Sequence, residues 1–207
     1  MAGSTSSSSD DDDAGRMYSK QAGAWVMSIG NGIIRKSGTR VTRNEEEAMR
    51  MVARCTDIPI PPLHWATYRI VNGVKFGSIY MDRVEGCRLD EIWDQFDDAR
   101  KERICQDIWA IVEKLRQIPR PPEFDHLYQC GADGSPSNDV LLKDMNQPPA
   151  PLLDDESLRD RISQRYLAHN GGSYREHLPD FLPRSDASVF THGDLTPGIF
   201  LWTRPVS

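Results

Sequence analysis

The sequence contains few cysteines and no long apolar segment. Only four cysteines occur in 207 residues, and no two of them form a C-x-x-C pair, so the sequence indicates neither a zinc site nor a disulfide framework. No apolar run approaches the roughly 20 residues that a membrane-spanning helix needs, and the N-terminus lacks the apolar core of a secretory signal. These absences predict a protein of the reducing cytoplasm with no membrane partner.

The sequence also has no excess of positive charge. Lysine and arginine number 25 against 31 aspartates and glutamates, which gives a formal net charge of -6. Such a chain attracts the phosphates of nucleic acids poorly, so we expect no nucleic-acid partner. The hydrophobic content of 38% and the charged content of 27% are ordinary for a globular protein. A length of 207 residues is enough for one two-lobed domain.

The first 22 residues have low complexity. Ser4–Ser9 is nearly all serine, and Asp10–Asp13 is a run of aspartates. Such a segment cannot bury enough apolar surface to offset the entropy lost on ordering. We therefore expect residues 1–22 to form a disordered acidic tail, and a phosphorylated serine tract is the functional alternative.

Residues 23–82 are β-rich. Two pairs of β-prone runs flank short turns, at 25–29 and 33–36 around Gly30-Asn31-Gly32, and at 67–71 and 74–81 around Asn72-Gly73. Each pair predicts a hairpin, because Gly and Asn tolerate positive φ. Between them, Glu45–Arg54 has helical periodicity, and the prolines that follow end the helix. This part therefore predicts a small antiparallel sheet with one helix against it.

Residues 83–207 are mainly helical. Helical patterns occupy 89–96, 97–118, 155–168 and 173–178, a Pro/Gly-rich loop occupies 123–153, and a short extended run occupies 188–191. The chain as a whole is thus expected to be an α+β protein with a β-rich first lobe and a helical second lobe. A cleft between two such lobes is a usual place for a small-molecule site.

The stretch Thr191-His192-Gly193-Asp194-Leu195-Thr196-Pro197 carries the most chemical information. An aspartate on a rigid loop can accept the proton of a hydroxyl group that attacks a phosphate. The stretch resembles the catalytic loop of aminoglycoside phosphotransferases and of choline-kinase-like enzymes, H-G-D-x-x-x-x-N, in the form found in fungal members. The resemblance implies that Asp194 is catalytic and that His192 braces the loop. The alternative is a His-Gly-Asp turn without chemistry.

The resemblance extends from Trp25 to Leu201 and implies a protein-kinase-like fold. It implies that Lys36 contacts nucleotide phosphates and that Glu47 holds Lys36, with Glu45 and Glu46 as neighbouring alternatives. The segment 80–86 resembles the family's hinge, so the main chain around Met81, Asp82 and Val84 is expected to bind the adenine of ATP. Gly30-Asn31-Gly32 is not a G-x-G-x-x-G loop, and a plain hairpin describes it.

Two departures from the family pattern concern the metal. The family has an asparagine five residues after the catalytic aspartate, but this sequence has Ile199, either as a replacement or through a deletion. An isoleucine side chain cannot coordinate Mg²⁺. The sequence ends at Ser207, before the family's later metal-binding aspartate, so we expect a C-terminally truncated chain with impaired metal binding.

Together these patterns lead to two hypotheses about function. The first is an ATP-dependent phosphotransferase that acts on a hydroxyl of an unidentified small molecule and is impaired in this chain, with ATP and Mg²⁺ implied by resemblance. The second is a nucleotide-binding or regulatory protein without catalysis. A protein kinase fits less well, because the loop reads H-G-D and not H-R-D.

Overall fold

The computed structural model describes residues 13–169, 171–172 and 177–203. The chain divides into two compact units. The first, which we call the sheet unit, comprises Met1–Glu113 with His192–Ser207, and the second, the loop unit, comprises Lys114–Thr191. The expected boundary at 82/83 between a β-rich and a helical part therefore lies inside the sheet unit.

The sheet unit is built on a five-stranded antiparallel sheet with the order β1-β2-β3-β5-β4. Its strands are β1 (Met17–Gln21), β2 (Ala24–Gly30), β3 (Ile33–Gly38), β4 (Leu63–Val71) and β5 (Val74–Asp82). Both predicted hairpins are confirmed. Asn31 and Asn72 have φ of 53° and 51°, and the glycine after each also has positive φ, as a two-residue turn between antiparallel strands requires.

Strand β1 lies within the segment that the composition predicted to be disordered. Met17 is 50% exposed, so the strand is not held by burial of its side chains. It is held by main-chain hydrogen bonds to β2, which a composition argument does not detect. The prediction of disorder over residues 1–22 therefore fails for 17–21, and residues 1–12, with the serine tract, lie outside the described residues.

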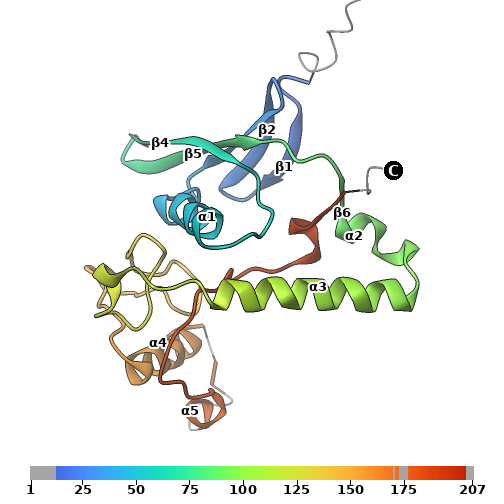
Figure 1. Cartoon of the computed structure of the whole chain (residues 1–207). Helices are drawn as coiled ribbons and strands as arrows, with labels where there is room; N and C mark the ends of the chain where they lie inside the picture. Colours follow the sequence, from blue (N-terminus) through green and yellow to red (C-terminus); the bar gives the residue numbers. More distant parts are fainter. Residues whose placement is uncertain (1–12, 170, 173–176, 204–207) are drawn as a thin grey trace, which may run out of the picture. The chain divides into compact units, whose positions relative to one another are not determined.

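Helix α1 (Arg43–Cys55) lies against one face of the sheet (Figure 1). The core between them is apolar and contains Val41, Ile79 and Met81, with Ala24, Ile34, Met49, Leu63 and Ala66 packed around it. The helix ends at Thr56, whose N–H and hydroxyl both donate to the carbonyl of Val52. The predicted helix at Glu45–Arg54 is confirmed.

The remaining elements are mostly helical. They are β6 (Cys87–Arg88), α2 (Leu89–Ile92), 3₁₀ turns at Trp93–Gln95, Pro122–Phe124 and Pro197–Ile199, α3 (Asp98–Arg116), α4 (Asp155–Ala168), α5 (Leu178–Phe181) and β7 (Leu201–Trp202). Helices α3 and α4 confirm two predicted helices, whereas 188–191 forms no strand. The helix predicted at 173–178 falls largely outside the described residues. No helix in the described part is long and apolar enough to cross a membrane.

The loop unit is organised around a buried ion pair. Arg161 Nη2 donates to Asp144 Oδ2 at 2.8 Å, and both residues are buried. The same guanidinium donates to the carbonyls of Leu142 and Ala150 at 3.0 and 3.2 Å. Asp144 also accepts main-chain N–H groups from Asn146 and Ala150, and these bonds lower the pKa of its carboxyl group. The irregular segment predicted at 123–153 is thus folded around side-chain contacts.

Candidate functional site

Lys36 lies on β3 and forms an ion pair with helix α1. In the register of the sheet it stands opposite Ile79, so both side chains lie on the face that carries α1. Lys36 Nζ is 2.5 Å from Glu45 Oε1, and the two side chains are 34% and 28% exposed. The lysine is therefore held by a charged partner while part of it remains accessible.

The residue that contacts Lys36 is Glu45, which corrects the expectation of Glu47. Helix α1 follows Thr42, so Glu45 lies in the first turn, close to the strand that leads into the helix. Glu47 is two residues further on, which rotates it by about 200° around the helix axis. The third candidate, Glu46, bonds to Arg50 and to the hydroxyl of Tyr68. Position relative to the helix start was the signal that could have distinguished the three.

Some main-chain groups of the hinge after β5 form hydrogen bonds and others do not. The N–H of Asp82 donates to Pro62 O at 3.0 Å and that of Arg83 donates to Gly32 O at 2.7 Å. Within the described residues, the peptide N–H and C=O of Val84 form no hydrogen bond. The Met81 side chain is buried in the core, so only its main chain could meet a ligand. A donor and an acceptor are therefore available at Val84 for the edge of a planar heterocycle.

The His-Gly-Asp loop exposes its carboxylate. The N–H of Asp194 donates to His192 Nδ1 at 3.3 Å, and both side chains are exposed. Gly193 has φ of 82° with open space where a Cβ would lie, so the backbone conformation and not crowding favours glycine there. The loop thus turns sharply between a bracing imidazole and an accessible carboxylate.

The chain after this loop is attached directly to the chain after the hinge. Strand β7 pairs with β6, and the N–H of Leu89 donates to Phe200 O at 2.9 Å. Gly86 approaches the attachment so closely that a Cβ would lie 2.7 Å from the carbonyl oxygen of Trp202. The Trp202 ring packs against Phe96, with the two ring centroids 5.2 Å apart. Nothing in the sequence pattern predicted this attachment, because two-residue strands carry no periodicity.

The sheet unit thus contains every predicted site residue. Lys36 is held by α1, Asp82 and Val84 belong to the hinge, and Asp194 lies on a loop joined to the hinge through β6 and β7. Lys36 and Asp194 form no ion pair or hydrogen bond with each other in the described part of the chain. The two residues share only their membership of the sheet unit.

Comparison with protein families shows which family the chain belongs to. Residues 33–207 match the phosphotransferase enzyme family, APH. The chain belongs to the phosphotransferase enzyme family. A comparison with curated protein sequences found no match. The resemblance noted at the His-Gly-Asp loop therefore extends over most of the chain, from the start of β3 onward.

Members of this phosphotransferase family typically use ATP and Mg²⁺. The residues present match the needs of ATP better than those of Mg²⁺. The Lys36 ammonium group and the free peptide groups of Val84 fit a nucleotide. A magnesium ion requires oxygen ligands, yet the position five residues after Asp194 is Ile199, whose apolar side chain is 44% exposed. Among the described residues, no three His, Cys, Asp or Glu side chains converge. Ile199 therefore supplies no metal ligand at this position.

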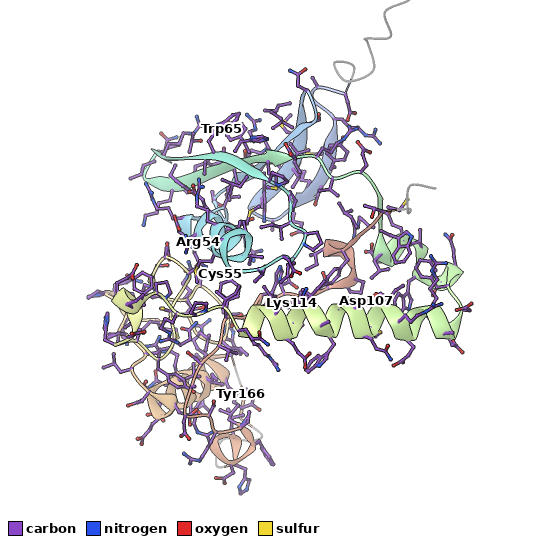
Figure 2. All side chains as sticks on the ribbon, in the orientation of Figure 1. Arg54, Cys55, Trp65, Asp107, Lys114 and Tyr166 are labelled. Carbon is purple, nitrogen blue, oxygen red and sulfur yellow. The ribbon has the colours of Figure 1, made fainter. Side chains whose placement is uncertain are left out.

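A separate groove of about 640 Å³ lies between the second half of α1 and residues 56–63. Its lining is apolar at Met49 and Ile58, with Arg54 among the polar residues, and Figure 2 labels Arg54 at the end of α1. None of the predicted site residues lines it. The groove is therefore distinct from the site that the phosphotransferase family implies.

Proposed function

We propose that this chain transfers the terminal phosphate of ATP to a hydroxyl group of a small molecule. The observation that carries the proposal is the Lys36–Glu45 ion pair at 2.5 Å. A lysine held in this way between a strand and the following helix can neutralise nucleotide phosphates in a fixed position. Membership of the phosphotransferase family supports the same activity.

Asp194 is the group that handles the acceptor hydroxyl. Its exposed carboxylate accepts the hydroxyl proton, and the hydroxyl oxygen forms a bond to the γ-phosphorus. The bond between the γ-phosphorus and the β–γ bridging oxygen breaks, and ADP leaves with that electron pair. The transferred group ends on the acceptor as a phosphate ester.

His192 holds the loop for this step. Its Nδ1 accepts the N–H of Asp194, which requires an imidazole without a proton on that nitrogen. The bond fixes the peptide that carries the carboxylate. Loss of this acceptor should therefore misplace Asp194 without removing it.

The nucleotide base is assigned to the hinge. The free N–H and C=O of Val84 can pair with one edge of adenine, and the main chain of Met81 and Asp82 leads into that position. Hydrogen bonds at the base and charge at the phosphates would then fix the nucleotide at two ends.

The direct test is phosphate transfer by the purified chain. ATP and Mg²⁺ are supplied with a panel of amino alcohols, aminoglycosides and sugars, and ADP release is followed together with the mass of the product. Lys36→Met should abolish transfer, because the phosphates lose their cation. Lys75→Met, which changes an exposed lysine on β5 of the same sheet, is the matched control. Equal transfer by the Lys36→Met variant and the wild type would refute the proposal.

A second candidate function is nucleotide binding without transfer. Ile199 favours it, because members of the family use Mg²⁺ and an isoleucine side chain cannot coordinate that ion. Thermal shift with ATP, in the presence and absence of Mg²⁺, separates the two candidates. Stabilisation that is independent of Mg²⁺ and unaccompanied by transfer supports the second. Transfer that increases in Ile199→Asn supports an enzyme that this residue impairs.

A further inference from the structure

Arg83, in the hinge, is held by residues from the beginning of the chain. Its Nη1 donates to Asp13 Oδ2 at 2.5 Å and to the hydroxyl of Tyr18 at 3.0 Å. The Tyr18 hydroxyl in turn donates to the same oxygen of Asp13. On the other side, Arg83 Nε donates to Glu85 at 2.7 Å. One guanidinium group therefore joins the N-terminal segment to the hinge.

The N-terminal segment is itself fixed on the sheet. Gly15 donates its N–H to Ser28 O at 2.9 Å, and Ser28 donates its N–H to Arg16 O at 2.8 Å. These bonds continue the β1–β2 ladder past Met17 and turn the chain back, and the φ of 91° at Gly15 suits glycine. These main-chain hydrogen bonds therefore place the Asp13 carboxylate beside Arg83.

The main chain of Arg83 is fixed as well. Its N–H donates to Gly32 O at 2.7 Å, in the turn between β2 and β3. Arg83 is thus held through its peptide by one turn and through its side chain by Asp13 and Tyr18. The next residue is Val84, whose peptide groups form no hydrogen bond within the described residues.

The contacts between Asp13, Tyr18 and Arg83 are partly shielded from water. The Asp13 and Arg83 side chains are 19% and 28% exposed. The hydrogen bond from Tyr18 lowers the pKa of Asp13, and the nearby charges of Arg16 and Arg83 act in the same direction. Asp13 therefore remains a carboxylate at neutral pH.

We propose that Asp13 and Tyr18 form a clamp that positions the hinge for the nucleotide base. This inference rests on the proposed function, because it assigns the base to Val84. The family match begins at residue 33, so the clamp residues Asp13 and Tyr18 precede the matched region.

The clamp acts through pre-organisation. A peptide that is already held in the binding conformation loses less freedom when a ligand pairs with it. Asp13 and Tyr18 are therefore positioning residues that never touch the nucleotide. Their removal should weaken binding of the base and leave binding of the phosphates, at Lys36, unchanged.

The test compares ligands that contain and lack the base. Calorimetry with the full chain measures the affinity for ATP, adenosine and inorganic tripolyphosphate. Asp13→Ala should weaken binding of ATP and adenosine by about twofold to fivefold, the range expected for loss of a charge pair at the surface, with binding of tripolyphosphate unchanged. Tyr18→Phe should have a smaller effect of the same kind. Lys20→Gln, which removes an exposed positive charge from the same strand, is the control.

The outcomes separate the clamp from the proposed function. If the wild type binds neither ATP nor tripolyphosphate, the proposed function fails and the clamp with it. If the wild type binds ATP and both clamp variants bind it equally well, only the clamp is refuted. Equal weakening of ATP and tripolyphosphate also refutes it, since that pattern indicates general destabilisation. Tyr18→Phe keeps the carboxylate and supplies the answer if Asp13→Ala does not fold.

Discussion

The two units of the chain are stabilised by different kinds of contact. The sheet unit has an apolar centre around Ile79, which is completely buried, and its main-chain polar groups are paired in the ladders of the sheet. The loop unit also buries apolar side chains, but its irregular main chain leaves carbonyls without ladder partners. Arg161 supplies donors to two of them and pairs with Asp144. A segment rich in proline and glycine can thus be ordered by one buried guanidinium group.

This difference predicts different responses to change. An apolar core loses stability in proportion to the volume removed. A buried ion pair leaves an uncompensated charge when either partner is lost, and the penalty is large. The loop unit should therefore be the more sensitive to pH and to single polar substitutions, whereas the proposed chemistry belongs to the sheet unit.

The largest effect is expected from Asp194→Asn. Loss of the proposed proton acceptor should reduce phosphate transfer by about 10²–10⁴-fold, while the melting temperature stays unchanged because the side chain is exposed. Transfer is measured as ADP release. Asp186→Asn, an equally exposed position in the loop unit, is the control and should retain activity. Loss of activity in both variants would contradict the assignment of chemistry to the sheet unit.

The second effect is expected from Asp144→Ala. Removal of the carboxylate leaves Arg161 buried without its partner, which should cost about 3–5 kcal/mol of stability. Hydrogen exchange should show faster exchange around α4 and residues 142–150. Protection of the β-sheet should persist. A uniform loss of protection in both units would show that they do not unfold separately.

The same residue predicts how stability depends on pH. The folded pKa of Asp144 is lowered below its ordinary value of 3.8 by hydrogen bonds from Asn146 and Ala150. Its contribution is therefore fully present above the ordinary pKa and is lost as the pH falls from that value toward the folded pKa. Wild type should lose stability in this acid range, and Asp144→Ala should lose less. Urea titrations at pH 7, 4 and 3 measure the difference.

The third effect is expected from Ile79→Ala. This side chain fills the core between the sheet and α1, so truncation should cost about 3 kcal/mol. In contrast to the loss caused by Asp144→Ala, this loss should hardly change between pH 7 and pH 3. Met145→Ala, at a 65% exposed position, is the control for loss of an apolar side chain without burial.

The smallest effect is expected from Arg100→Gln. The Arg100 guanidinium lies 5.0 Å from the ring centroid of Trp202 and 5.2 Å from that of Phe96. Removing this cation should cost about 0.5–1 kcal/mol and loosen β7, which anchors the His-Gly-Asp loop. The melting temperature and the transfer rate should both fall slightly. An unchanged rate with a lowered melting temperature would separate the anchor from the chemistry.

Local signals and long-range contacts differ in how well the sequence predicted the structure. Hairpins around Asn31 and Asn72 follow from local turn chemistry, and α1 follows from its periodicity, so all were predictable. The partner of Lys36 was left open among three adjacent glutamates, with Glu47 preferred, because the sequence alone does not fix how each is turned around the helix. The Asp144–Arg161 pair was missed because no local rule joins residues 17 positions apart. Strand β1 was missed because main-chain pairing does not depend on composition.

The order of the strands has a practical consequence for shortened versions of the protein. A fragment that starts where the family match starts, at residue 33, would lack β1 and β2. Strand β3, which is an interior strand of the full sheet, would become an edge strand with a row of unpaired N–H and C=O groups. Other chains could then pair with that edge. Such a fragment would be prone to self-association, and its behaviour would not represent that of the intact chain.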